Sequence, residues 1–137
     1  MTYETITVDV ADNIATITLN RPERMNACSL EMAGEINDAL STMQGVRALI
    51  ITGAGRGFCS GADLAARGDR PVNGGEGSYI ALTRHYNPLM MTLARLNLPI
   101  ITAVNGAAAG VAQFELLIQN GLKASAMVIH ALRPAGP

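Results

Sequence analysis

An apolar run followed at once by closely spaced glycines constrains the fold of this chain more than any other feature. The run is Ala48–Ile51, and the glycines stand at positions 53, 55, 57 and 61. A short continuous apolar run is typical of a strand covered on both faces. Glycines let the backbone turn sharply and expose successive N–H groups, because no Cβ forbids positive φ. The stretch predicts a buried strand and then a loop whose amides suit a negatively charged oxygen.

A helix is expected to begin near Gly61–Leu64, and its unpaired first-turn amides would point the same way as those of the loop. An ordinary strand-to-helix turn can carry the same glycines, so this loop alone leaves both interpretations open. The pattern then repeats: Pro99–Val104 predicts a second buried strand, and Asn105–Val111 is a run of small residues. If the two strands are parallel neighbours, both loops lie at the same edge of one sheet.

The remaining segments predict elements that support this sheet. Alternation in Thr5–Val10 and Ile14–Leu19, around a turn at residues 11–13, predicts a β-hairpin. Pro22 makes residues 20–27 a loop. Ser29 is a plausible N-cap of a helix that ends before Gly45. The expected apolar face of that helix is Leu30, Ala33, Ile36, Leu40 and Met43, with Glu31 suited to its first turn and Glu35 and Asp38 off the face.

The middle of the chain predicts a polar loop and a second helix. Residues 67–77 are rich in glycine and proline and predict a mobile surface loop. Residues 79–96 have helical spacing, which Pro88 should kink or split.

Composition narrows the class of protein. A chain of 137 residues is long enough for one domain with a core and too short for two of ordinary size. The net charge of −1 and the single Lys123 leave no basic stripe, so nucleic acid is not expected as a partner. Cys28 and Cys59 fit no metal-ligand spacing, and without an N-terminal signal sequence they favour a cytoplasmic setting. No apolar run is long enough to predict a membrane span.

Three motifs in order resemble the crotonase superfamily, the enoyl-CoA hydratases and isomerases. They are Asn20-Arg21-Pro22 with Asn26-Ala27, then Gly57–Leu64, and then Pro99 through Asn105–Gly110. The resemblance covers about residues 3–111. It implies an α/β fold, the ClpP/crotonase spiral of ββα units, truncated after the second glycine loop. Within the single domain 1–137, residues 112–137 form an atypical tail.

The resemblance also implies a site and a substrate. Two backbone amides from separate loops, those of Ala62 and Val111, would form an oxyanion hole for the carbonyl of a coenzyme A thioester. The substrate would be an acyl-CoA of fatty-acid or aromatic-acid metabolism, with no permanently bound cofactor and no metal. A homo-oligomer, trimeric or hexameric, is the habit of the family. The residues implied to border coenzyme A are Arg24, Asn26, Ala27, Gly61, Ala62, Asp63 and Leu64.

The sequence departs from the family where proton transfer is expected. Family hydratases place a glutamate three residues after the second oxyanion donor, and Phe114 stands there. Glu115 is one residue late, a rotation of about 100° on a helix, yet it is the nearest candidate for an acid–base residue. The expected reaction is proton transfer beside a thioester. The alternative is a catalytically inactive remnant or an acyl-CoA-binding fragment.

Four further polar residues are interpreted as structural. Asp63 is expected to cap or brace the start of the helix that follows the loop. His85 has no carboxylate at a partnering spacing, and His130 lies in the tail, so both are expected to be surface or packing residues. Cys59 is expected to pack as a small side chain and not to act as a nucleophile.

Overall fold

The computed structural model describes residues 2–61, 63, 84, 86–108 and 126–130. Strand β1 (Ile6–Ala11) and strand β2 (Ile14–Leu19) pair in antiparallel fashion, with Ala11 opposite Ile14. Asp12 and Asn13 between them both have positive φ, 53° and 63°. Two left-handed residues make the tight turn whose twist matches that of paired strands. The predicted hairpin is therefore confirmed.

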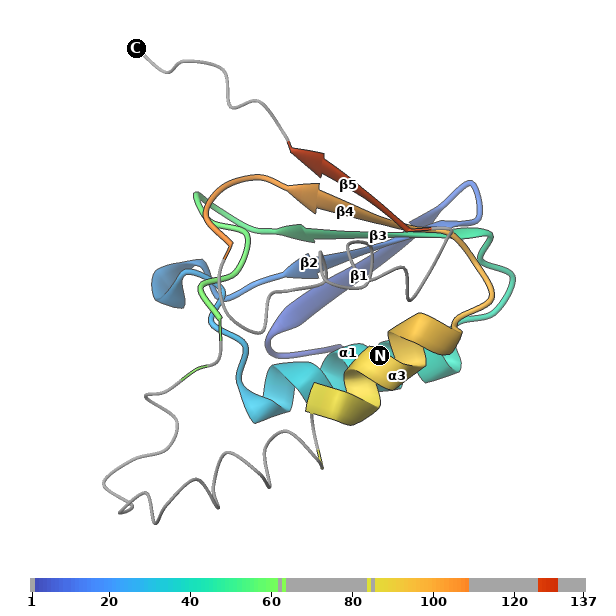
Figure 1. The fold of residues 1–137 in the computed structure, drawn as a ribbon, viewed down its shortest axis with the longest axis horizontal. Helices are drawn as coiled ribbons and strands as arrows, with labels where there is room; N and C mark the ends of the chain where they lie inside the picture. Colours follow the sequence, from blue (N-terminus) through green and yellow to red (C-terminus); the bar gives the residue numbers. More distant parts are fainter. Residues whose placement is uncertain (1, 62, 64–83, 85, 109–125, 131–137) are drawn as a thin grey trace.

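The hairpin is the first part of a five-stranded mixed sheet of order β1-β2-β3-β4-β5. Strands β3 (Ala48–Gly53), β4 (Ile100–Val104) and β5 (Ala126–His130) all run parallel to β2. The two predicted strands are thus parallel neighbours, as the argument about their loops requires. Strand β5 was not predicted; it comes from the tail after residue 111 and pairs with β4 along its whole length. Figure 1 shows β1 and β5 at the two edges of the sheet.

Helix α1 (Leu30–Thr42) joins β2 to β3 and begins as predicted. The Ser29 hydroxyl accepts a hydrogen bond from the Met32 amide at 3.1 Å, and Glu31 lies in the first turn. The predicted apolar face is confirmed at Ala33, Ile36 and Leu40, but it is wrong at Leu30, which is 41% exposed. Met32 and Ala39 are buried instead, because the helix face that contacts the sheet includes these two residues and does not include Leu30.

Helix α3 (Asn87–Arg95) precedes β4 and packs beside α1 on one face of the sheet (Figure 1). Pro88 lies in its first turn, where a missing N–H costs nothing. Thr92 donates a hydrogen bond to Asn37 of α1 at 2.7 Å, which joins the two helices. The predicted loop at 20–27 contains one short 3-10 helix, η1 (Pro22–Arg24). The predicted loop at 67–77 lies outside the described residues.

The core lies between the sheet and the two helices. Every second residue of the central strands is buried, including Ile17, Leu49, Ile51 and Ile100. The prediction that β3 is covered on both faces holds for one face only, because Ala48 and Ile50 are partly exposed. Within the described part of the chain, no helix is long and apolar enough to cross a membrane.

Candidate functional site

The glycine loop begins where β3 ends and folds back on its own backbone. Gly55 and Gly61 have φ values of +76° and +107°, so they need the freedom that the sequence predicted for this loop. A Cβ on Gly53 would lie 2.5 Å from the Phe58 carbonyl oxygen, which shows how closely the chain returns. Phe58 and Cys59 are 0% and 1% exposed, so the far side of the loop is anchored in the core.

The second loop meets the first at the carboxyl ends of β3 and β4. The Ala107 carbonyl oxygen accepts hydrogen bonds from the amides of Phe58 and Cys59, at 3.0 and 3.2 Å. Cys59 and Ala108 form a parallel bridge beyond the strands proper. Figure 1 shows both loops at the end of the sheet toward which these two strands point. The prediction that the two loops share one edge is confirmed over their described residues.

Asparagine side chains hold the first loop, residues 53–61 (called the central loop below), from two sides. Asn26, which is 0% exposed, donates to the carbonyls of Ala54 and Gly57, both at 2.9 Å. Asn105 accepts from the Gly53 amide at 3.1 Å. Its own amide donates to the carbonyls of Gly55, at 3.1 Å, and of Gly57, at 3.3 Å. Sequence reasoning assigned no such role to Asn105.

Residues 21–28 run alongside the far end of the loop and are hydrogen-bonded to it. Ser60 donates its amide to the Met25 carbonyl at 3.0 Å. The Cys28 amide donates to Gly61 at 2.7 Å, and the Asp63 amide donates to Cys28 at 3.0 Å. This pairing keeps Arg24, which is exposed, and Ala27, which is partly buried, next to residues 60–63.

An ion pair reinforces the same contact. Arg21 Nη1 lies 2.9 Å from Asp63 Oδ2, and the two side chains are 19% and 8% exposed. The same Arg21 nitrogen donates to the Ala27 carbonyl at 2.7 Å. Asp63 therefore ties the end of the loop to residue 21, while the helix start that it was expected to cap or brace lies outside the described residues.

Of the predicted site residues, the structure brings together Arg24, Asn26, Ala27, Gly61 and Asp63. Asn26 differs from the others, because its buried side chain acts on the loop and has no exposed surface to offer a ligand. The remaining predicted residues, Ala62, Leu64, Val111 and Glu115, lie outside the described residues, as do Phe114 and His85. His130 is the last residue of β5.

The two cysteines are free thiols in the core beneath this site. Burial raises the pKa of Cys28 to about 12 and also raises the pKa of Cys59, so both are protonated near neutral pH. A protonated buried thiol is a poor nucleophile, in line with the packing role expected for Cys59. Among the described residues, no group of three or more histidine, cysteine or acidic side chains could hold a metal ion.

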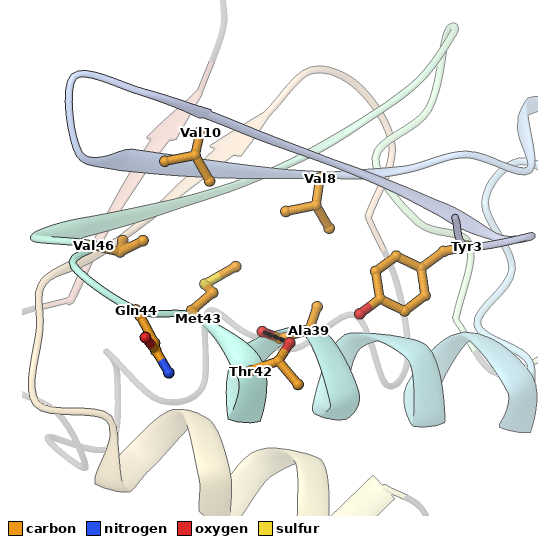
Figure 2. Close-up of a pocket in the computed structure, with 8 residues that line it drawn as sticks. All are labelled: Tyr3, Val8, Val10, Ala39, Thr42, Met43, Gln44 and Val46. Atoms are coloured by element: carbon orange, nitrogen blue, oxygen red, sulfur yellow. Dashed lines mark hydrogen bonds between the residues drawn. The ribbon is translucent and has the colours of Figure 1, made fainter. Parts of the chain in front are cut away.

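A separate hollow lies under the edge strand β1, between that strand and α1 (Figure 2). It has a volume of about 320 Å³ and opens between β1, the C-terminal end of α1 and the entry to β3. Figure 2 shows its lining of Tyr3, Val8, Val10, Ala39, Thr42, Met43, Gln44 and Val46. None of these residues belongs to the predicted site.

Comparison with known proteins gives the family of the chain. The family model described as "Enoyl-CoA hydratase/isomerase" matches residues 9–118. The 1,2-epoxyphenylacetyl-CoA isomerase of Escherichia coli K12 is 43% identical over 110 residues, which are 78% of this chain and 42% of that protein. A protein of Rhodobacter capsulatus named "Probable enoyl-CoA hydratase" is 43% identical over 111 residues, 80% of this chain and 42% of its own length.

Solved structures give the same result. An enoyl-CoA hydratase/isomerase from Xanthobacter autotrophicus Py2 superposes with a TM-score of 0.75 at 35% identity, covering 93% of this chain and 46% of that one. An enoyl-CoA hydratase from Bacillus anthracis gives a TM-score of 0.69 at 32% identity, with 80% and 43% covered. The chain thus spans about two fifths of the length of the two named relatives and less than half of these two solved structures.

Proposed function

The chain belongs to the enoyl-CoA hydratase/isomerase family, and from this premise we propose that it binds a coenzyme A thioester at the junction of its two loops. The thioester oxygen would be held by the backbone amides of Ala62 and Val111. One observation carries the proposal: the two loops meet at the carboxyl edge of neighbouring parallel strands, through the carbonyl of Ala107. Amides fixed in this way stabilise an enolate oxygen without titrating.

Four amides near Ala62 are excluded as donors to a substrate oxygen, which leaves those of Gly61 and Ala62. Phe58, Cys59, Ser60 and Asp63 all donate their amides to backbone carbonyls. They are therefore committed to holding the loop and are not available to a substrate oxygen. Arg24, Ala27, Gly61 and Leu64 are proposed to border the coenzyme A moiety, and Asp63 and Asn26 to hold that border in place.

The proposed reaction class is proton transfer next to the thioester carbonyl, through an enolate. Glu115 is the nearest candidate for the acid–base group. No resident cofactor is needed, since coenzyme A arrives as part of the substrate. A relative named 1,2-epoxyphenylacetyl-CoA isomerase supports an acyl group that derives from an aromatic acid. The acyl groups of fatty-acid metabolism are the alternative that we propose.

A second candidate function is binding of acyl-CoA with little or no hydration. Phe114 favours it, because it stands where the family hydratases carry their first glutamate. A positioned acid–base group contributes about 10²–10⁴-fold to such a reaction. Amides without that group would polarise the thioester but move protons poorly, so we propose at best a weak hydratase.

We also propose that the chain self-associates, as a trimer or hexamer, in the cytoplasm. Val10, Leu30, Met91 and Ile129 are large apolar residues exposed on its surface. Sedimentation velocity measures the assembly directly. A single species of one chain across micromolar concentrations would refute it.

The test of the site replaces Ala62 by proline, which removes the proposed amide donor. Ala62→Gly keeps the amide and is the matched control. Binding of crotonyl-CoA by calorimetry should weaken, and any hydration, followed as loss of enoyl thioester absorbance, should disappear in the proline variant alone. If both variants bind and turn over like the unmodified chain, the amide of Ala62 is not part of the site.

Turnover then separates the two candidate functions. Hydration at roughly 1–10³ s⁻¹ would establish an ordinary enzyme and overturn the proposal of a weak one. Loss of that activity in Glu115→Gln would assign the acid–base role to Glu115. Binding without measurable turnover would favour the acyl-CoA-binding function.

A further inference from the structure

The Gly57 carbonyl is held by two side chains that come from different parts of the chain. Nδ2 of Asn26 donates to it at 2.9 Å, from the segment before α1. Nδ2 of Asn105 donates to it at 3.3 Å, from the segment after β4. The second hydrogen of each amide group reaches another carbonyl of the same loop, Ala54 or Gly55.

Each asparagine is fixed at its oxygen as well. Oδ1 of Asn26 accepts from the Arg21 amide at 2.8 Å, and Oδ1 of Asn105 accepts from the Gly53 amide at 3.1 Å. A carboxamide offers two donors and an acceptor in one rigid plane, and no charged or hydroxyl side chain offers that set. Both residues therefore use both amide hydrogens and the carbonyl oxygen on this loop and its flanks.

This arrangement determines the direction of the next amide. In a trans peptide the C=O and N–H groups point in opposite directions. Because two donors hold the Gly57 carbonyl on one side, the Phe58 N–H must point to the other, where it donates to Ala107 of the second loop at 3.0 Å. The Gly57–Phe58 peptide is thus held at both ends, and it couples the two loops.

We propose that Asn26 and Asn105 are positioning residues: a carboxamide clamp that presets the relative orientation of the two loops before a ligand arrives. The functional role of the clamp rests on the proposed function, because the orientation of the loops matters only if their amides hold a thioester oxygen. Its mechanical part, a loop fixed through the Gly57 carbonyl, is testable without any ligand.

Hydrogen exchange in the free chain tests the mechanical part. Asn26→Ala and Asn105→Ala should each make the amides of residues 53–61 exchange about tenfold faster, because carbonyl partners are lost. Asn105→Asp keeps an acceptor for the Gly53 amide but not the donors, and should behave like the alanine variant. Asn37→Ala is the matched control, since it removes an asparagine hydrogen bond between α1 and α3, away from the loops. Exchange unchanged from the parent, or raised equally by Asn37→Ala, overturns the clamp.

The functional part is tested with acetyl-coenzyme A carrying an isotope label at the thioester carbonyl. Infrared spectra should show the carbonyl stretch shifted to lower frequency on the unmodified chain and on Asn37→Ala. In Asn105→Ala the shift should shrink, while the Kd changes by less than about threefold, because the coenzyme A portion supplies most of the affinity. A full shift in Asn105→Ala overturns the positioning role. If the unmodified chain itself gives no shift, the proposed function is refuted. The exchange data then decide whether Asn26 and Asn105 fix the loop.

Discussion

Replacing Gly106 by alanine would place a Cβ where the backbone of the central loop already lies. The added carbon would be 2.0 Å from the Arg56 carbonyl oxygen and 3.1 Å from the Gly57 Cα. Real Cβ atoms essentially never come within 3.0 Å of such atoms, so one loop must retreat by about 1 Å. Overpacking of this kind costs about 1–3 kcal/mol. Weakening the two hydrogen bonds to Ala107 adds about 1 kcal/mol.

Gly34→Ala is the matched control, because the same methyl group enters open space on α1. Removing a glycine from a helix interior should stabilise the chain by about 1 kcal/mol. Urea unfolding followed by circular dichroism should therefore move the two midpoints in opposite directions, with an unfolding slope of about 1–3 kcal/mol per molar urea. If Gly106→Ala unfolds at the same urea concentration as the parent while Gly34→Ala is stabilised, the two loops do not pack as closely as the structure shows.

Three further substitutions or treatments test other contacts. For Glu35, burial raises the carboxyl pKa, but hydrogen bonds from the Thr5 hydroxyl and nearby amides outweigh this effect and lower the pKa below its ordinary value. Glu35→Gln should thus lower the free energy of unfolding by about 1–3 kcal/mol at neutral pH, and this difference from the parent should shrink as the pH falls through that lowered pKa. A difference that stays constant with pH in urea titrations would contradict this. Removing Arg21 and Asp63 singly and together should give a coupling energy of about 1–2 kcal/mol in a double-mutant cycle, whereas additive losses would mean that the ion pair contributes nothing. Cys28, with its pKa near 12, should react with a thiol reagent only as fast as the chain opens, and rapid modification of the native protein would disprove its burial.

Features with a local chemical cause were predictable from the sequence. The Asp12-Asn13 turn, the Ser29 cap and the end of β3 at its glycines each depend on residues within a few positions of one another. The meeting of the two loops followed from one added rule, that parallel neighbours end at the same edge of a sheet. The comparisons confirm the family that these motifs indicated.

Features that depend on distant residues were missed. No neighbouring residue in the sequence marks Asn105 as a hydrogen-bond donor to loop carbonyls about fifty positions earlier. Asn26 is expected from the sequence to border coenzyme A, whereas its side chain lies inside the loop. Leu30 was assigned to the core because apolarity alone does not fix the rotation of a helix. Strand β5 does carry a signal in the sequence, the short apolar run Ala126–Ile129, but such a run alone does not distinguish a strand from a helix segment. Ala62, Val111 and Glu115 stay predictions.

The Asn105 hydrogen bonds reach residues 48 to 52 positions away, and this separation has a consequence for the order of folding. Long-range contacts form only after the chain entropy between them has been lost, whereas the β1–β2 hairpin closes through a two-residue turn. The junction of the two loops should therefore assemble after the barrier to folding, once β3 and β4 have paired. Substitutions at Asn105 would then speed unfolding and leave the refolding rate nearly unchanged. The segment proposed to bind substrate would be the last to form and among the first to open.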